Sequence, residues 1–210
     1  MMNKKYLFLI LVILFDISLF ISNNYLITDS IFYEHYQSQI SEENILDILT
    51  FKDKWEGLNY LILPFIILVK IGLLGFWLLS ASILFNIKLG FSKVIECLII
   101  AEFVFIFPPL IKMVWFFLFQ NDYTLLDVHF FEPLSIFSMF NPAYLDTWII
   151  YPLKTLNLFE FFYILLLSYV IAKKSSLDFD ASLKFNFAGY GSALVVWILF
   201  VTFLSINLGA

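Results

Sequence analysis

The chain has one cysteine, no arginine and few charged residues, and each shortage narrows what it can be. Charged residues make up 14% of its 210 positions, whereas 62% are hydrophobic. A water-soluble domain of this size needs a largely polar surface, which this composition cannot supply. A lipid bilayer removes that requirement, because its hydrocarbon solvates apolar side chains from outside. The composition therefore predicts an integral membrane protein, with the lipid bilayer as its first partner.

The missing chemical groups argue against other classes. Cys97 is the single cysteine, so no disulfide framework or thiolate metal site can form within the chain. All 12 basic residues are lysines and the net charge is −5, so we expect no nucleic-acid partner. No zinc-protease, serine-hydrolase, P-loop or dinucleotide-binding motif occurs. We therefore expect no enzyme activity and no cofactor.

Long apolar runs separated by polar segments set the architecture. A membrane-spanning helix needs about 20 predominantly apolar residues. The sequence predicts an all-α integral membrane fold, a single polytopic domain over residues 1–210 built as a bundle of about five transmembrane helices with short interfacial helices on the outer side. The expected spans are residues 6–22, 58–87, 94–119, 156–172 and 185–208.

Two segments between these spans are predicted as outer loops. Residues 23–57 are polar and acidic, and Ser41 before two glutamates predicts a short helix, on the membrane surface or in solvent. Residues 120–155 contain apolar pieces too short to span, which favours interfacial or re-entrant helices with Trp148 and Tyr151 at headgroup depth.

Three prolines lie inside predicted spans. Proline lacks a backbone N–H and clashes with the preceding helical turn. We therefore expect Pro64 to interrupt the second span, and Pro108 and Pro109 to kink or break the third.

The distribution of lysines predicts the orientation. Cytosolic segments of bacterial membrane proteins carry an excess of basic residues. We expect a bacterial inner-membrane protein with a cytosolic amino terminus, an outward carboxyl terminus and an uncleaved first span, although a cleaved signal peptide is the alternative. Seven lysines then lie inside and three outside: Lys4, Lys5, Lys88, Lys93, Lys173, Lys174 and Lys184 against Lys52, Lys54 and Lys154.

Asp16, Lys70 and Glu102 fall deep within three different predicted spans. Helical rise places them within about 5 Å of one another in depth. An unpaired charge at that depth is costly, so we expect Lys70 to face Glu102, Asp16 or both. The cluster either handles protons or a charged substrate, or is a structural ion pair that fixes helix register. Other charged residues are expected to be solvated at the interfaces: Lys93, Glu96, Lys112 and Glu160.

Small residues mark expected helix-packing positions, because they let helix backbones approach closely within a membrane. The partner is either another span of this chain or a second subunit. The positions are Gly72 and Gly75 in the second span, and Ala188, Gly189, Ser192 and Ala193 in the fifth.

Both histidines, His35 and His129, lie in the predicted outer loops. Glu34 and Glu132 are near them in sequence, so a zinc site across the two loops is conceivable. Two histidines in loops are usually polar surface, and we expect no metal site.

The carboxyl-terminal part of the chain contains an ordered set of short motifs. They are Leu145-Asp146, Leu156-Asn157-Leu158-Phe159-Glu160 at the start of a helix, Ser182-Leu183-Lys184, and Ala188-Gly189-Tyr190-Gly191. With the five-span count, the stretch from Tyr144 to Ser205 resembles the later spans of the Yip-type (Ypt-interacting-protein-like) multi-spanning family. The resemblance implies a membrane-organising or accessory protein.

Three functions remain open from the sequence. The first is a non-enzymatic accessory or scaffold subunit of a membrane complex, associating with other membrane proteins or with itself. The second is a small transporter or permease subunit that works through Asp16, Lys70 and Glu102. The third is a membrane enzyme with a site on the outer face around His35 and His129.

Overall fold

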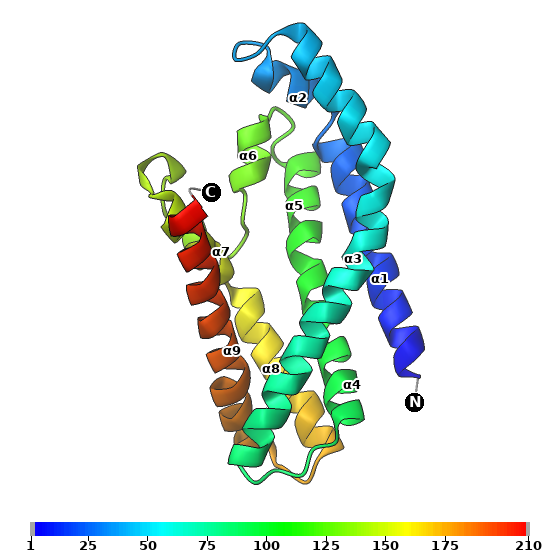
Figure 1. The fold of residues 1–210 in the computed structure, drawn as a ribbon, viewed down its shortest axis with the longest axis vertical. Coiled ribbons are helices and arrows are strands. Elements are labelled where there is room, and N and C mark those ends of the chain that lie inside the picture. The colour runs from blue at the N-terminus through cyan, green and yellow to red at the C-terminus, as the bar shows by residue number, and fades with distance from the viewer. Residues whose placement is uncertain (1–2, 209–210) are drawn as a thin grey trace.

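The computed structural model describes residues 3–208, which form an elongated bundle of helices (Figure 1). Within those residues no β-strand occurs. Four helical stretches are long and apolar enough to cross a membrane. These findings confirm an all-α membrane protein. The four stretches are Lys4–Leu26, Glu42–Leu84, Phe91–Leu118 and Phe179–Leu208.

The elements follow one another with short connections. In chain order they are α1 (Lys4–Ile21), the π-helical turn η1 (Ser22–Leu26), α2 (Asp29–Tyr36), α3 (Glu42–Leu84), α4 (Phe91–Glu102), the 3₁₀ turn η2 (Phe103–Ile106), α5 (Phe107–Leu118), α6 (Leu125–Phe130), η3 (Ile136–Met139), η4 (Pro142–Tyr144), α7 (Thr147–Thr155), α8 (Leu158–Lys174) and α9 (Phe179–Leu208).

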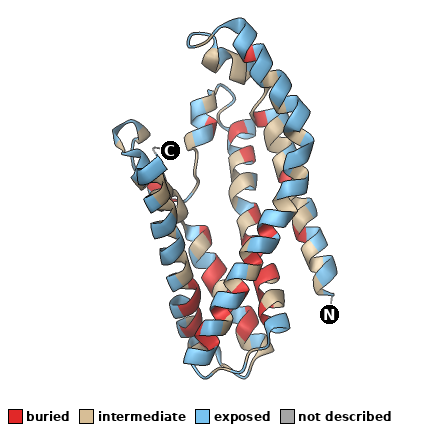
Figure 2. Ribbon diagram, in the orientation of Figure 1, coloured by how far each residue is buried: buried red, intermediate tan, exposed pale blue. Residues whose placement is uncertain are grey.

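Four helices form the packed centre of the bundle. α3 contacts α4, α4 contacts α8, α8 contacts α9, and α9 returns to α3. α1 lies outside this ring, against α3 and α4. Figure 2 shows the buried positions concentrated where these helices meet, and Leu78, Leu98 and Leu167 are fully buried there. Burying apolar side chains between helices in this way gives close packing and van der Waals contact, the main attraction available inside a membrane.

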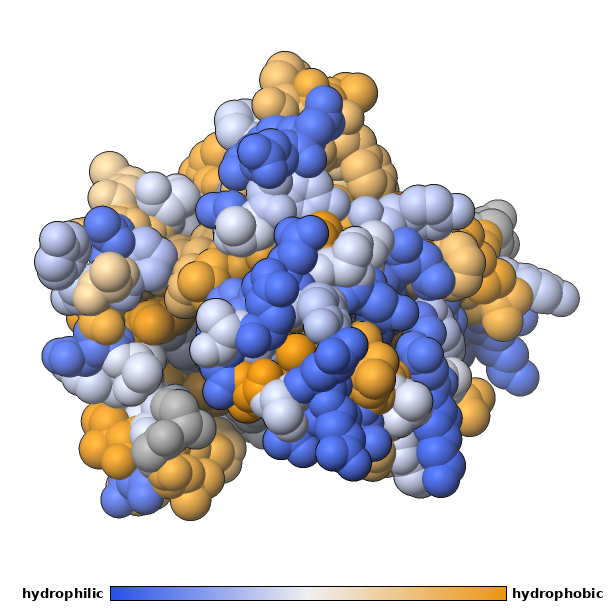
Figure 3. Space-filling view, turned by 90° about the horizontal axis from the view of Figure 1, so that it is seen from above, coloured by the Kyte–Doolittle hydropathy of each residue, from blue (hydrophilic) through white to orange (hydrophobic). Residues whose placement is uncertain are grey.

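The two ends of the bundle differ in charge. One end, here called the acidic end, carries α2, the start of α3, α6 and α7 (Figure 1). Viewed from that end, hydrophilic side chains cover much of the surface (Figure 3). The other end, here called the lysine-rich end, carries residues 85–90 and 175–178. The amino end of α1 lies near it, because Lys4 donates a hydrogen bond to Ser92 at the start of α4.

The segment expected as a loop over residues 23–57 is instead largely helical. α3 begins at Glu42, sixteen residues before the predicted second span, and continues without a break to Leu84. Ser41 caps its first turn by accepting a hydrogen bond from the Asn44 amide, and acidic side chains follow at the positive end of the helix dipole. The short surface helix predicted at Ser41 is thus the first part of the membrane-spanning helix itself.

The prolines act differently from one another. α3 runs through Pro64 without interruption, which differs from the sequence-based expectation. In the third span the helix does change, because the 3₁₀ turn Phe103–Ile106 separates α4 from α5. Pro108 and Pro109 lie in the first turn of α5. Because they have no backbone N–H, they cannot donate hydrogen bonds to the carbonyls four residues earlier, which belong to the 3₁₀ turn. The predicted break in the third span is therefore observed just before its proline pair.

Candidate functional site

An ion pair between α3 and α4 forms the centre of the candidate site. Lys70 Nζ lies 3.0 Å from Glu102 Oε2. The Glu102 side chain is 3% exposed, whereas that of Lys70 is 40% exposed in the protein without its membrane. A carboxylate buried to this extent requires a close cation or a proton, because desolvation of a bare charge costs several kcal/mol.

The break before Pro108 positions the groups around Lys70. Residues three apart lie above one another in a 3₁₀ turn, which brings Glu102 and Phe105 to the same face. The Lys70 ammonium lies 4.2 Å from the centre of the Phe105 ring. Lys70 therefore has a carboxylate and an aromatic face from one short stretch of chain, and both attract a cation.

Aromatic rings extend the site from η2 across α8 to α9. Tyr163 stacks on Phe105 with ring centres 5.0 Å apart, and Tyr190 lies 4.6 Å from Tyr163. The Tyr190 hydroxyl donates a hydrogen bond of 2.5 Å to Glu160 Oε2. We call Lys70, Glu102, Glu160, Tyr163 and Tyr190 the interior cluster; it draws on four helices.

Two polar atoms of this cluster are buried without a hydrogen-bond partner. They are Glu102 Oε1 and the Tyr163 hydroxyl, and Tyr163 is fully buried. Buried polar groups are normally satisfied, so an orphaned pair at one place calls for an explanation. The cluster also contains two carboxyl groups and one ammonium group, an excess of one acid.

The structure brings Lys70 and Glu102 together and leaves Asp16 apart from them. Asp16 forms no ion pair within the described residues, and its Oδ1 is buried without a partner. It lies within electrostatic range of Tyr60 on α3. Tyr60 precedes Lys70 by ten residues, about 15 Å along a helix. The estimated depths of Asp16, Lys70 and Glu102 in their spans are similar, so depth alone could not show which acid pairs with Lys70.

Glu160 is the main addition to the predicted site. Instead of being solvated at an interface, it is half-buried and pairs with Tyr190. Spacing gave a signal for this, since Glu160, Tyr163 and Leu167 recur at helical intervals and share one face of α8. The sequence could not show that this face meets α9 and η2.

Other polar contacts join the remaining helix pairs. At the lysine-rich end, Lys174 on α8 pairs with Glu96 on α4 at 2.7 Å, so Glu96 is also more than an interfacial charge. Between α8 and α9, Asn186 donates to the Ser168 hydroxyl at 3.1 Å. Between α3 and α9, the Trp77 indole donates to Ser192 at 3.0 Å. Each contact around the ring of four helices thus includes a polar bond.

The predicted packing residues fall into two groups. A side chain added at Gly75 would lie 2.8 Å from Ile95 of α4, and one added at Gly189 would lie 2.9 Å from Leu78 of α3. These two glycines serve contacts within the chain. By contrast, Gly72 has open space around it and Ala188 is exposed. Ser192 is exposed as well, although its hydroxyl accepts a hydrogen bond from Trp77 of α3, and Ala193 is partly buried.

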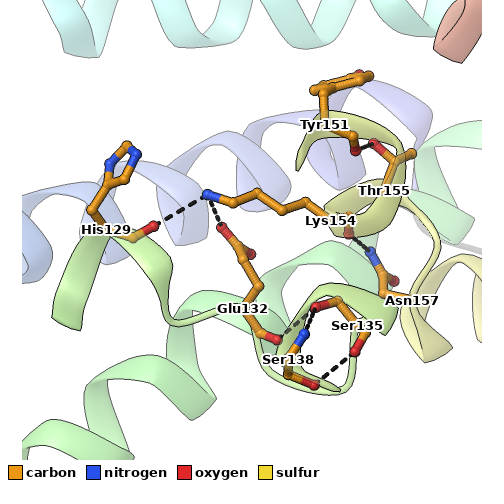
Figure 4. A network of polar contacts seen from close by, with 8 residues as sticks. All are labelled: His129, Glu132, Ser135, Ser138, Tyr151, Lys154, Thr155 and Asn157. Carbon is orange, nitrogen blue, oxygen red and sulfur yellow. Dashed lines mark hydrogen bonds and ion pairs between the residues drawn. The ribbon is translucent and has the colours of Figure 1, made fainter. Parts of the chain in front are cut away.

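A second polar network lies at the acidic end (Figure 4). Lys154 of α7 lies 3.5 Å from Glu132 and donates to the His129 carbonyl oxygen at 3.2 Å. Partial burial lowers the pKa of the His129 imidazole, and the nearby lysine cations lower it further. The two histidines do not come together with other ligands: no group of three or more His, Cys, Asp or Glu suited to a metal occurs in residues 3–208.

Comparison with known proteins adds no family to these observations. No protein-family model matches the chain, and neither a curated protein nor a solved structure shows significant similarity to it. The Yip-type resemblance therefore stays a prediction from sequence.

Proposed function

We propose that this chain is a five-span inner-membrane protein that serves as an accessory or scaffold subunit and binds another membrane helix through α9. The fifth span in this proposal is α8. Its 17 residues cover about 26 Å at the helical rise, close to the thickness of a bilayer core. α8 contacts α9 and α4, and both α9 and the Phe91–Leu118 stretch that begins with α4 are long and apolar enough to cross with it.

The orientation in this proposal follows from the charge of the two ends. The lysine-rich end faces the cytosol, because basic residues near span ends are retained on that side. The acidic end, with α2, α6 and α7, then faces outward. This is the orientation expected from the sequence, and it places the helices of the acidic end on the outer side of the membrane.

One observation carries the proposed association: a strip of small residues interrupts the exposed wall of α9. Ala188 is exposed, and Ser192 is exposed although its hydroxyl accepts from Trp77 of α3. Apart from its chain neighbours and the backbone of its own helix, Gly191 has nothing within 4 Å of where its side chain would begin. The strip is flanked along the helix by Phe187 and Val195, which are 48% and 55% exposed. Small residues between large ones leave a shallow groove into which a second helix can pack closely.

The interior contacts support a scaffold role. Because polar bonds and buried glycines hold α3, α4, α8 and α9 to one another, α9 is presented on a fixed bundle. A preorganised helix loses little freedom when a partner packs against it, which favours association.

The test fills the groove on α9. Gly191→Leu should weaken association with the partner helix by about tenfold, the effect of losing about 1.4 kcal/mol of packing. The measurement is the size of the complex in mild detergent by native electrophoresis, with cross-linking in lipid to distinguish self-association from a different protein.

Gly57→Leu is the matched control, because Gly57 is another helical glycine with open space around it and lies in the polar part of α3. It should leave the complex unchanged. A complex of the same size and stability in Gly191→Leu as in the wild type would exclude α9 as the interface, and a monomer in lipid would exclude the scaffold proposal.

A further inference from the structure

The charges of the interior cluster do not balance. Lys70 neutralises one carboxylate, and the 3.0 Å pair assigns it to Glu102. Glu160 lies within electrostatic range of both Lys70 and Glu102 and has only the neutral Tyr190 hydroxyl as a hydrogen-bond donor. With both acids ionised the cluster carries one uncompensated negative charge within the bundle, which is costly in a medium of low dielectric.

A proton fits this site better than a metal cation. Sodium and calcium ions require several oxygen ligands around an open position, whereas the Lys70 ammonium already occupies the side of Glu102 that faces α3. Glu102 Oε1 and the Tyr163 hydroxyl lie beside each other without a hydrogen bond of ordinary length, so the hydroxyl is placed to donate to the carboxyl group in its ionised or its protonated form. One added proton makes the cluster neutral and requires no additional space.

A groove at the acidic end gives Glu160 a route to the surface. Its volume is about 450 Å³, and it lies between residues 134–139, the start of α8 and Leu194 of α9. Glu160 is the one ionisable side chain among the described residues that line it, and Ser135 and Asn157 contribute polar groups. The cluster is therefore reached from the acidic end through Glu160.

We propose that the interior cluster binds one exchangeable proton, shared between Glu102 and Glu160 and exchanged through the groove at the acidic end. Binding adds a hydrogen ion from water to a carboxylate oxygen, and no other bond changes. This property goes beyond the proposed scaffold function and does not depend on association through α9.

Infrared spectroscopy of the purified, lipid-reconstituted chain at neutral pH tests the charge balance, because a protonated carboxyl group has its own carbonyl stretching band. Asp16→Asn is the reference protein, since Asp16 is a separate intramembrane acid. The reference should show one protonated carboxyl group. Glu160→Gln and Glu102→Gln should each lose that band, because each leaves one acid opposite Lys70.

Lys70→Met gives the opposite result under the same proposal. It removes the cation and leaves two acids, so the band should roughly double, with one proton for each carboxyl. Glu132→Gln is the matched control at the acidic end and should leave the band unchanged. The proposal is overturned if the reference shows no protonated carboxyl group, or if the band persists in both glutamine variants.

The route is tested by the rate at which the carboxyl proton exchanges with deuterium in the solvent. Leu194→Trp fills the groove and should slow exchange several-fold. Leu199→Trp, at an exposed position on the same helix outside the groove, should exchange at the reference rate. Equal rates in the two variants would overturn access through this groove.

Discussion

Single residues in this protein are best understood from the charges that surround them. Lys70 has a carboxylate at 3.0 Å and an aromatic face at 4.2 Å, so its cation is stabilised from two directions. At the acidic end Lys154 has a similar setting, with Glu132 at 3.5 Å and the Phe137 ring centre at 5.2 Å. In this chain, which has no arginine, lysines form the ion pairs and cation–aromatic contacts that arginines often form in other proteins.

The pKa of His129 responds to the charge of Lys154. Its pKa lies below the ordinary value of 6.5 because of partial burial and then the Lys154 and Lys112 cations, while Glu132 acts in the opposite direction. Lys154→Gln should raise the His129 pKa toward 6.5, since it removes a cation and leaves the Glu132 charge unpaired. The measurement is an NMR titration of the imidazole signal in a His35→Gln background.

Lys52→Gln is the control for this titration, because Lys52 pairs with Asp29 and is absent from the groups that influence His129. A fall in the His129 pKa on Lys154→Gln would contradict the assignment.

The lowered pKa of His129 also determines how this residue affects the free energy of unfolding as the pH changes. The folded-state pKa lies below the unfolded one, so the His129 contribution is fully present above about pH 6.5 and declines as the pH falls below it.

At the scale of elements, each contact around the ring of α3, α4, α8 and α9 combines apolar packing with at least one polar bond. Apolar packing alone distinguishes helices poorly in a membrane, because lipid tails are as apolar as leucine. A polar bond at each contact fixes which faces meet and at what height, since a shifted helix would leave the groups unpaired. The candidate site is the α3–α4 contact between Lys70 and Glu102, extended by Glu160, Tyr163 and Tyr190.

The α4–α8 contact provides a direct test through charge exchange. Glu96 and Lys174 are 17% and 15% exposed, so their 2.7 Å pair is partly shielded from water. Glu96→Lys and Lys174→Glu should each lower the free energy of unfolding by about 1 kcal/mol or more, because each places like charges together.

The double variant restores opposite charges and should regain most of that loss. The coupling free energy is measured by a double-mutant cycle of thermal unfolding in mild detergent. Additive losses in the double variant would show that the pair does not hold α8 to α4.

Much of the helical pattern is predictable from the sequence at this scale, whereas features that depend on tertiary contacts are not. Length and hydropathy identified the apolar stretches, and the Pro108–Pro109 pair located the break in the third span. Pro64 was expected to interrupt its helix, but α3 continues through it. Membrane helices tolerate such a proline where other groups satisfy the backbone carbonyl that it leaves without a donor. The pairing of Glu160 with Tyr190 could not be predicted, because it depends on how α8 and α9 are rotated against each other.

At the scale of the whole molecule, the protein is a polar-ended bundle with charge of opposite sign at its ends. The acidic end extends well past the apolar part of the bundle, because α3 is 43 residues long and begins there with a polar stretch. Lysines gather at the other end. This asymmetry was visible in the sequence, whereas the length of α3 was missed because its first part lacks the apolar run of a span.

Cysteine labelling tests both the orientation and the number of spans. In a Cys97→Ala background, a membrane-impermeant maleimide added to intact cells should label Gln39→Cys and Asn207→Cys, and should label Ser176→Cys only after permeabilisation. All three positions are exposed, so a failure to react reports the side of the membrane rather than burial. Gln39 lies at the acidic end and Ser176 in the connection between α8 and α9.

The three positions separate the alternatives. Labelling of Ser176→Cys alone would mean that the lysine-rich end faces outward. Labelling of Gln39→Cys and Ser176→Cys without Asn207→Cys would mean that α8 does not cross and that four helices span. The expected pattern requires both the cytosolic lysines and a spanning α8, which also places the interior cluster within the membrane and its groove on the outer side.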